Sequence, residues 1–274
     1  MITMPAPIAG KTCPLSELAD VAVAAVQQGV APQVVFDLDD TLFLVRPRKR
    51  AIFRELAETY GREHDLHEAL HTLAAGPIPY DVVEALGTVG ITHDAHVAEL
   101  KKGFFDRFFD GSYTAHDAVN EGAVAYVNHL ADQGVKVVYL TGRPEEMQPQ
   151  TLETLAAGGF PVDERTRLIL KETANAKMLD ADFKGLKAAE IAAVGPVLAT
   201  FDNEPANLNA MKAAMADARF FLLDTDHSPN PPTLEMDVYV MDTFEVERRN
   251  LATALANSPD FNSGSKWTIN VAAV

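Results

Sequence analysis

Short apolar runs recur along the chain and alternate with longer amphipathic segments. Runs of four to six apolar residues between helical segments are typical of strands that are buried on both faces of a parallel sheet. The predicted strands are Val34–Asp37, Val135–Leu140, Arg167–Leu170, Val197–Phe201, Phe220–Leu223 and Val238–Met241. The predicted helices around them are Leu15–Gln28, Ala118–Gln133, Met147–Ala157, Phe183–Val194, Glu204–Asp217 and Phe244–Ala256. This alternation predicts an α/β fold with a doubly wound parallel sheet.

The alternation stops between Pro47 and Tyr113, where apolar residues recur at helical spacing. Because this stretch follows directly on the first predicted strand, we interpret it as an insertion that can fold over the end of the sheet. The sequence therefore predicts a core of residues 1–46 and 114–274 and a mainly helical cap of residues 47–113. Its predicted helices are Arg48–Tyr60, His64–Leu73, Pro79–Leu86 and Ala95–Phe109, and the pairs Phe104-Phe105 and Phe108-Phe109 are interpreted as core residues of the cap.

Composition narrows the class of protein. The chain has 274 residues and a formal net charge of −16, which repels nucleic-acid phosphates and anionic membranes, so neither is expected as a partner. Cys13 is the only cysteine, which excludes an intrachain disulfide and a cysteine-based zinc cluster. The first residues lack the basic segment and apolar core of a signal peptide, and the sequence has no apolar run long enough to span a bilayer. A cytoplasmic location is expected, and the oligomeric state is left open.

The first predicted strand ends in a group of acids, Asp37-Leu38-Asp39-Asp40-Thr41. Side chains alternate along a strand, so Asp37 and Asp39 are expected on one face and Asp40 on the other. Two carboxylates that converge beyond a buried strand are costly without a cation. A metal-dependent site is therefore the first hypothesis. The alternative, a strand that runs into a polar turn with a helix cap, needs one Asp rather than three.

Polar groups also follow two later predicted strands, as Thr141-Gly142-Arg143 and as Asp202-Asn203-Glu204. Ligands of doubly wound sheets lie outside the carboxyl ends of the strands, so these groups are expected beside the first acids. A lysine precedes the second of these strands. Together with the position of the insertion, the four motifs resemble the haloacid dehalogenase-like (HAD) superfamily of phosphohydrolases, over roughly Val34 to Asp224. The phosphatase branch with a helical C1-type cap is the most similar.

The resemblance implies a Mg²⁺-dependent phosphatase that acts through an aspartyl-phosphate on a small phosphorylated metabolite. In that scheme Asp37 is the nucleophile, and Asp39 gives a proton to the leaving oxygen before it acts as base toward water. The metal ligands are the carboxylates of Asp37 and Asp202 and the backbone carbonyl of Asp39. Thr141 and the Gly142 amide would bind the phosphoryl oxygens. Arg143 is interpreted either as a phosphate ligand or as part of a surface ion pair.

Two assignments have several candidates: the lysine that completes the site, and the side chain that assists Asp202. Lys184 is preferred because it begins a predicted helix, Lys177 is the next choice, and Lys171 and Lys187 are interpreted as solvated charges. Many members of the superfamily carry a second Asp four residues after the first, where this chain has Ala206. One of the neighbouring polar side chains must then assist Asp202, and the candidates are Asn203, Glu204 and Asn207.

Several alternatives remain open at this stage. In the superfamily that the chain resembles, a phosphotransferase or sugar-phosphate mutase would keep the same residues. A dehalogenase of that superfamily would lack the acid at the position of Asp39. A protein that kept the sheet but lost catalysis is disfavoured by the intact set of acids. From a different class, His67-Glu68-Ala69-Leu70-His71 matches the H-E-x-x-H helix of zinc proteases, although such a short pattern also arises by chance on a polar helix face. The basic cluster Arg46–Arg50 could attract an anionic substrate or form a solvated helix start.

Overall fold

The computed structural model describes residues 15–245. Its centre is a six-stranded sheet in the order β5-β4-β1-β6-β7-β8, in which every neighbouring pair is parallel. The predicted doubly wound α/β fold is thereby confirmed. Strand β1 lies between β4 and β6, so the carboxyl ends of these three strands are adjacent. The strands are β1 Gln33–Phe36, β4 Lys136–Pro144, β5 Thr166–Lys171, β6 Val197–Asp202, β7 Arg219–Leu223 and β8 Tyr239–Met241.

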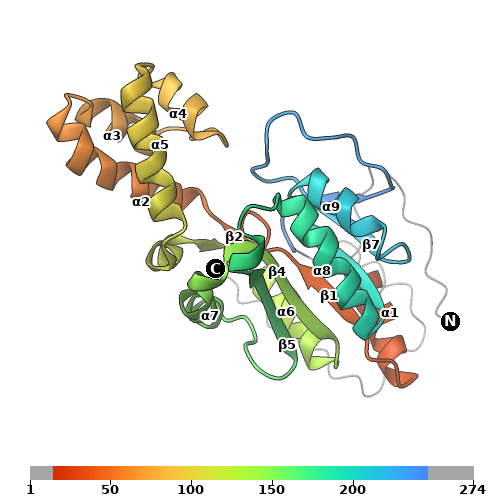
Figure 1. Cartoon of the computed structure of the whole chain (residues 1–274). Coiled ribbons are helices and arrows are strands. Elements are labelled where there is room, and N and C mark those ends of the chain that lie inside the picture. Colours follow the sequence, from red (N-terminus) through yellow and green to blue (C-terminus); the bar gives the residue numbers. More distant parts are fainter. Residues whose placement is uncertain (1–14, 246–274) are drawn as a thin grey trace, which may run out of the picture.

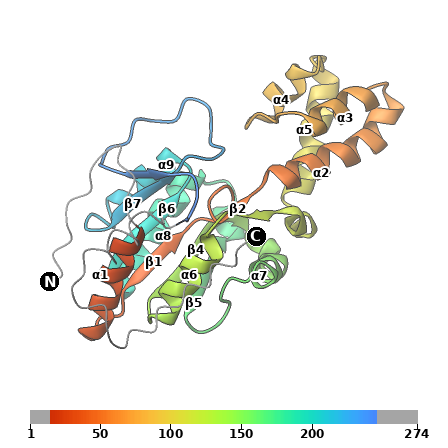
Figure 2. The ribbon, with the colours of Figure 1, turned by 180° about the vertical axis from the view of Figure 1, so that it is seen from behind.

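Both faces of the sheet are covered by helices, and this explains why the strands are apolar throughout. Val34 and Phe36 of β1 belong to one hydrophobic cluster, while Val35 between them belongs to a second one on the opposite face. The first cluster lies under α1 (Leu15–Gln27) and α6 (Ala123–Asp132), and the second under α8 (Asp180–Val194) and α9 (Pro205–Lys212). Figure 1 shows α8 and α9 in front of the sheet. In Figure 2, which shows the molecule from behind, α1 and α6 lie in front of the sheet.

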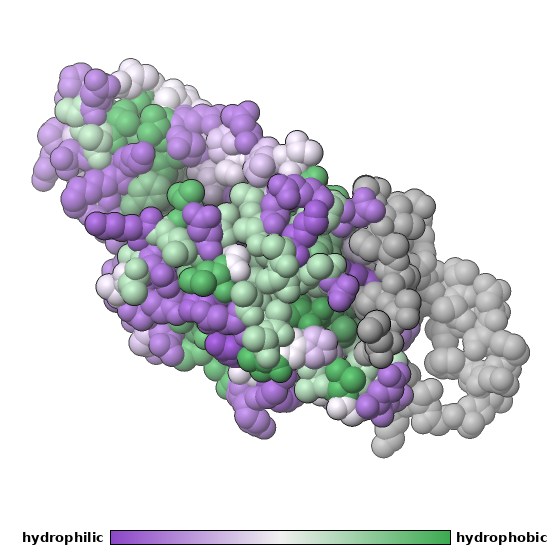
Figure 3. All heavy atoms as spheres, turned by 45° about the vertical axis from the view of Figure 1, so that its right-hand side comes forward, coloured by the Kyte–Doolittle hydropathy of each residue, from purple (hydrophilic) through white to green (hydrophobic). Residues whose placement is uncertain are grey.

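The inserted segment forms a helical unit that projects from one end of the sheet (Figure 1). Its helices share a separate hydrophobic cluster that includes Phe53, Leu70 and Leu86. The elements are α2 Arg46–Leu56, a π-helical turn Ala57–Gly61, α3 His67–Ala75, α4 Val82–Thr88 and α5 Asp94–Phe108. We retain the name cap for residues 47–113. On the face drawn in Figure 3, hydrophobic side chains gather on the cap among hydrophilic ones.

A short antiparallel ribbon forms the stem of the cap. Strand β2 (Phe43–Leu44), on the way into the cap, pairs with β3 (Ala118–Val119) on the way out. A 3-10 turn, Gly111–His116, precedes β3, and the Asn120 amide donates to the carbonyl of Thr41 at 2.9 Å. The chain therefore enters and leaves the cap at the same place, directly after the acids that follow β1.

The predicted helix Ala118–Gln133 was wrong at its start. Its first residues pair with β2, and Gly122 has φ +76°, a left-handed conformation that precedes the true helix α6. The predicted helix Phe244–Ala256 also fails where it is described, since Phe244 lies in an irregular segment; the residues from 246 onward lie outside the described part. Cys13 lies outside it as well. Within residues 15–245, none of the helices has the length and apolar character needed to cross a bilayer.

The candidate active site

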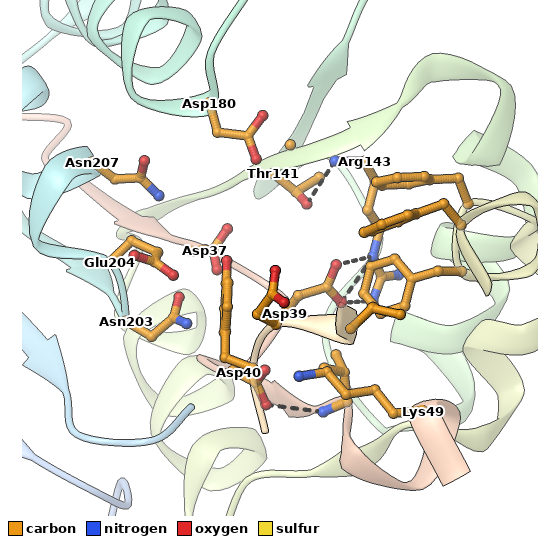
Figure 4. A pocket seen from close by; sticks show the side chains of 18 of the residues that line it. Asp37, Asp39, Asp40, Lys49, Thr141, Arg143, Asp180, Asn203, Glu204 and Asn207 are labelled. Carbon is orange, nitrogen blue, oxygen red and sulfur yellow. Dashed lines mark hydrogen bonds and ion pairs between the residues drawn. The ribbon is translucent and has the colours of Figure 1, made fainter. Parts of the chain in front are cut away.

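The acids and hydroxyls that follow the central strands converge at one end of the sheet (Figure 4). Asp37 follows β1, Thr141 lies near the end of β4, and Asp202 ends β6. All three are buried, with exposed fractions of 6%, 1% and 1%. Because neighbouring parallel strands end at the same edge, the sheet alone brings these side chains together.

Lys184 completes this group from the adjacent helix. Its Nζ lies 2.6 Å from Asp37 Oδ1 and 2.6 Å from Asp202 Oδ2, and the residue is only 2% exposed. Helix α8 begins at Asp180, so Lys184 stands on its second turn and reaches back over the strand ends. Of the other candidates, Lys171 and Lys187 pair with carboxylates outside this group, and Lys177 is exposed.

Burial and ion pairing have opposite effects on the pKa values of Asp37 and Lys184. Burial raises the pKa of Asp37 to about 8, even though Lys184 acts in the opposite direction. The pKa of Lys184 is also raised, because the charges of Asp202 and Asp37 outweigh the effect of its own burial. Two buried carboxyl groups thus share one ammonium group, and one negative charge is left uncompensated whenever both acids are ionised.

Asp202 is held by its own neighbours. Its Oδ1 accepts from the backbone N–H of Glu204 and from Asn207 Nδ2, both at 2.9 Å. The other two candidate side chains are engaged elsewhere: the Asn203 amide donates to the carbonyl of Asp226, and the Glu204 carboxylate accepts from Ser228. Of the three candidates, Asn207 is the side chain that orients Asp202.

Asp39 lies in a second ion-pair cluster beside the first. Arg48 Nη2 is 2.7 Å from Asp39 Oδ1, and Arg143 Nε is 3.1 Å from Asp39 Oδ2. Both arginines also bind Asp117. Burial opposes ionisation of Asp39, but the charges of Arg143 and Arg48 outweigh it and hold the pKa of this carboxyl well below its usual value. In this conformation Asp39 is a carboxylate.

This cluster corrects two interpretations made from the sequence. Arg143 contacts other side chains and is 2% exposed, so the pair it forms is buried and does not lie on the surface. The basic cluster is a solvated helix start only in part: Arg46 is exposed at the first residue of α2, whereas Arg48 is 0% exposed and Lys49 is buried against Asp226 at 2.7 Å. Sequence reasoning missed Asp117, which carries no motif of its own.

Strand alternation predicted Asp40 on the face opposite Asp37 and Asp39, and this prediction is wrong. Strand β1 ends at Phe36, so the alternation does not extend through the acids. Asp40 has φ +54° in a tight turn, lines the same cavity as Asp37, and accepts from the N–H of Val45 at 3.1 Å. Its hydrogen bond to the start of the cap is consistent with the structural role expected from the sequence.

A cavity of about 250 Å³ lies over these groups, between the core and the cap. Its floor contains Asp37, Asp39, Thr141 and Lys184, and its cap side consists mainly of aromatic and aliphatic residues. Gly142 lines it too, and a Cβ there would lie 2.6 Å from Asp180 Oδ2. A side chain at this position would require the exposed Asp180 carboxylate to move.

Comparison with known proteins adds the family. The profile of haloacid dehalogenase-like hydrolases matches residues 33–195. The chain belongs to this family. A phosphoglycolate phosphatase of Cereibacter sphaeroides (strain ATCC 17025) is 31% identical over 122 residues, which are 44% of this chain and 56% of that protein. The chain therefore spans about half the length of the curated relatives it matches.

Two solved structures share the fold of the chain. A protein provisionally assigned as a phosphatase from Clostridium difficile superimposes with a TM-score of 0.53 at 14% identity, over 82% of this chain and 98% of that one. A protein provisionally assigned as β-phosphoglucomutase from Thermotoga maritima gives 0.50 at 18% identity, over 82% and 99%. At such identities the likeness concerns the fold alone.

The donor set of this site fits Mg²⁺. Magnesium prefers a few carboxylate and carbonyl oxygens together with retained water, and the carboxylates of Asp37, which lines the cavity, and Asp202 contact the same ammonium group. When both acids are ionised, a divalent cation would offset the negative charge that Lys184 leaves uncompensated. The carbonyl of Asp39, next along the turn, is the third ligand that the family resemblance implies.

The H-E-x-x-H segment lies in the cap, away from these acids. His67 and His71 share a helix face, but the carboxylate that contacts both rings belongs to Glu58 of the π-helical turn and not to Glu68. All three side chains are substantially exposed. Neither histidine lines the cavity between the core and the cap.

Proposed function

We propose that the hydrolase is a Mg²⁺-dependent phosphatase that cleaves small phosphate monoesters through an aspartyl-phosphate on Asp37. The observation that carries this proposal is the buried Asp37–Lys184–Asp202 group, of which Asp37 and Lys184 line a cavity that the cap covers. Carboxylates that attack phosphorus split one difficult displacement into two easier ones. The names of the curated relatives support this class of reaction and make phosphoglycolate a reference ester for its tests.

In the first step an oxygen of Asp37 forms a bond to phosphorus while the bond from phosphorus to the ester oxygen breaks. Lys184 favours the ionised form of Asp37, and the Thr141 hydroxyl with the Gly142 amide would bind phosphoryl oxygens. When bound, Mg²⁺ supplies positive charge that stabilises the transferred phosphoryl group. Water then attacks the phosphorus of the aspartyl-phosphate, which releases inorganic phosphate and restores Asp37.

Asp39 is assigned the proton transfers, and the structure sets a condition on that role. The leaving alkoxide needs a proton, whereas the two arginines keep Asp39 ionised. To act as an acid, the Asp39 carboxyl must leave Arg48 and Arg143 and take up a proton. Arg48 belongs to α2 of the cap, so a movement of the cap would loosen this contact.

The first expected result is hydrolysis that depends on divalent metal. Purified protein should release inorganic phosphate from p-nitrophenyl phosphate and from small alkyl phosphates in millimolar Mg²⁺. A chelator should abolish the activity, because two clustered carboxylates would then lack their compensating cation. Colorimetric phosphate measurement distinguishes hydrolysis from transfer to a second hydroxyl group, as in a mutase. Equal rates with Mg²⁺ and with chelator would refute the metal requirement.

Asp39→Ala tests the acid role. Good leaving groups depart without a proton, so the variant should lose about tenfold in kcat on p-nitrophenyl phosphate but about 10²–10⁴-fold on an alkyl phosphate. Steady-state kinetics on the two esters gives the ratio. The matched variant Asp117→Ala also disrupts the arginine cluster but removes no proton donor, so it should affect both esters to the same extent. An equal loss on both esters in Asp39→Ala would remove the assignment.

A further inference from the structure

The cap side of the cavity is aromatic, and two of its phenylalanine rings are exposed. Phe105 in α5 and Phe109 just beyond its end are 38% and 47% exposed, although both line the cavity above the acids. Their rings are stacked with centroids 6.0 Å apart, one helical turn from each other. Large apolar side chains left exposed beside a polar site are a common sign of a binding surface.

The remaining cap residues of this wall extend the apolar surface. Tyr80 is 41% exposed, and Val82 lies beside it. The charged residues there are already engaged: Lys49 pairs with Asp226 at 2.7 Å, and the Asp81 side chain accepts from the N–H of Glu84 at the start of α4. The wall therefore offers mainly ring faces and methyl groups, together with one tyrosine hydroxyl and one carboxylate.

The cations of the cavity floor are engaged as well. Lys184 lies between Asp37 and Asp202, and Arg143 binds Asp39. Among the described residues that line the cavity, each Lys and Arg thus has a carboxylate partner. A second anionic group on the substrate, such as a carboxylate or another phosphate, would lose its hydration without gaining an ion pair.

We propose that the cavity selects phosphate monoesters of apolar alcohols, above all those with a single aromatic ring, over esters of anionic or polyhydroxylated alcohols. This inference rests on the phosphatase activity proposed above. The phosphoryl group lies at Asp37, and the organic group packs against Phe105 and Phe109. A volume of about 250 Å³ is large enough for a one-ring ester.

Esters of matched reactivity test this selectivity. Benzyl phosphate, phosphoglycolate and glycerol 3-phosphate all release a primary alcohol, so differences in kcat/KM report mainly on the organic group. We expect kcat/KM for benzyl phosphate to exceed the other two by about 10–100-fold. In the double variant Phe105→Ala/Phe109→Ala, kcat/KM for benzyl phosphate should fall at least about tenfold more than that for phosphoglycolate.

A matched control and a charge variant complete the design. Val83 is an apolar cap residue of similar exposure, 41%, that does not line the cavity, so Val83→Ala should leave the preference unchanged. Phe109→Lys places an unpaired cation in the wall and should raise the ratio of phosphoglycolate to benzyl phosphate turnover. Thermal unfolding of each variant shows that it is folded.

The outcomes separate this inference from the proposed function. A wild-type preference for phosphoglycolate or glycerol 3-phosphate, or equal losses on both kinds of ester in the double variant, overturns the apolar selectivity while Asp37-dependent hydrolysis persists. Absence of Asp37-dependent hydrolysis of any of the three esters, and of p-nitrophenyl phosphate, overturns the phosphatase proposal instead.

Discussion

Asp37→Asn is expected to lower kcat for Mg²⁺-dependent phosphate release by about 10⁴-fold or more. The amide has nearly the same size and shape, but it is not a nucleophile toward phosphorus, so the first of the two displacements is lost. The substitution also removes one of the two carboxylates that share Lys184. Steady-state phosphate release measures the effect, and thermal unfolding shows whether the variant retains its fold.

Asp40→Asn is the matched control for this variant. Asp40 lines the same cavity three residues further on, is equally buried at 6%, and accepts a hydrogen bond from Val45 that an asparagine side chain can also accept. Its activity should stay within a few-fold of wild type. Wild-type rates in Asp37→Asn would show that another group attacks the phosphorus. Equal losses in both variants would point to a general disturbance of the turn.

The sheet and the strand-end acids were predictable because both follow from local patterns. Burial on two faces leaves an uninterrupted apolar run, and Val34, Val35 and Phe36 are such a run. The rule that ligands bind at the carboxyl ends of parallel strands then places Asp37 beside Asp202 without any knowledge of side-chain contacts. Lys184 was predicted less directly, from its position at the start of a predicted helix.

The buried ion pairs of Asp39 could not be predicted, because they depend on contacts distant in sequence. Arg48 and Asp117 are 69 residues apart and meet only because the stem ribbon brings the two ends of the cap together. A run of basic residues is usually solvated, and nothing in its spacing distinguishes Arg48 from its neighbours. The turn at Asp40 was not predicted for a related reason, because a positive φ at a non-glycine residue does not appear as a periodic pattern in the sequence.

The aromatic pairs of α5 show the same limit in the cap. Helical spacing correctly indicated that Phe104 belongs to the core of the cap, where it is 2% exposed. The same spacing assigned Phe105 and Phe109 to that core, yet both line the cavity with large exposed fractions. Periodicity identifies apolar faces but not what covers them, and substrate selectivity depends on the second property.

Lys184→Met should lower kcat by about 10³-fold and destabilise the metal-free protein by about 3–5 kcal/mol, because it leaves Asp37 and Asp202 buried without their ammonium partner. Mg²⁺ should restore more stability to this variant than to wild type, since a cation bound only by the folded state shifts the folding equilibrium toward it. Denaturant unfolding with and without Mg²⁺ measures both effects.

Lys187→Met separates this effect from the loss of any lysine on α8. Lys187 is also nearly buried, at 8% exposed, but its partners Glu172 and Glu190 are substantially solvent-exposed and regain water when the lysine is removed. Its loss should cost no more than about 1 kcal/mol, with no dependence on Mg²⁺. If the two variants lost equal stability, or if Mg²⁺ failed to stabilise Lys184→Met beyond wild type, the acids at the strand ends would not form the cation site. The charge argument for a metal-dependent phosphatase would then fail at its starting point, the pairing of Asp37 with Asp202.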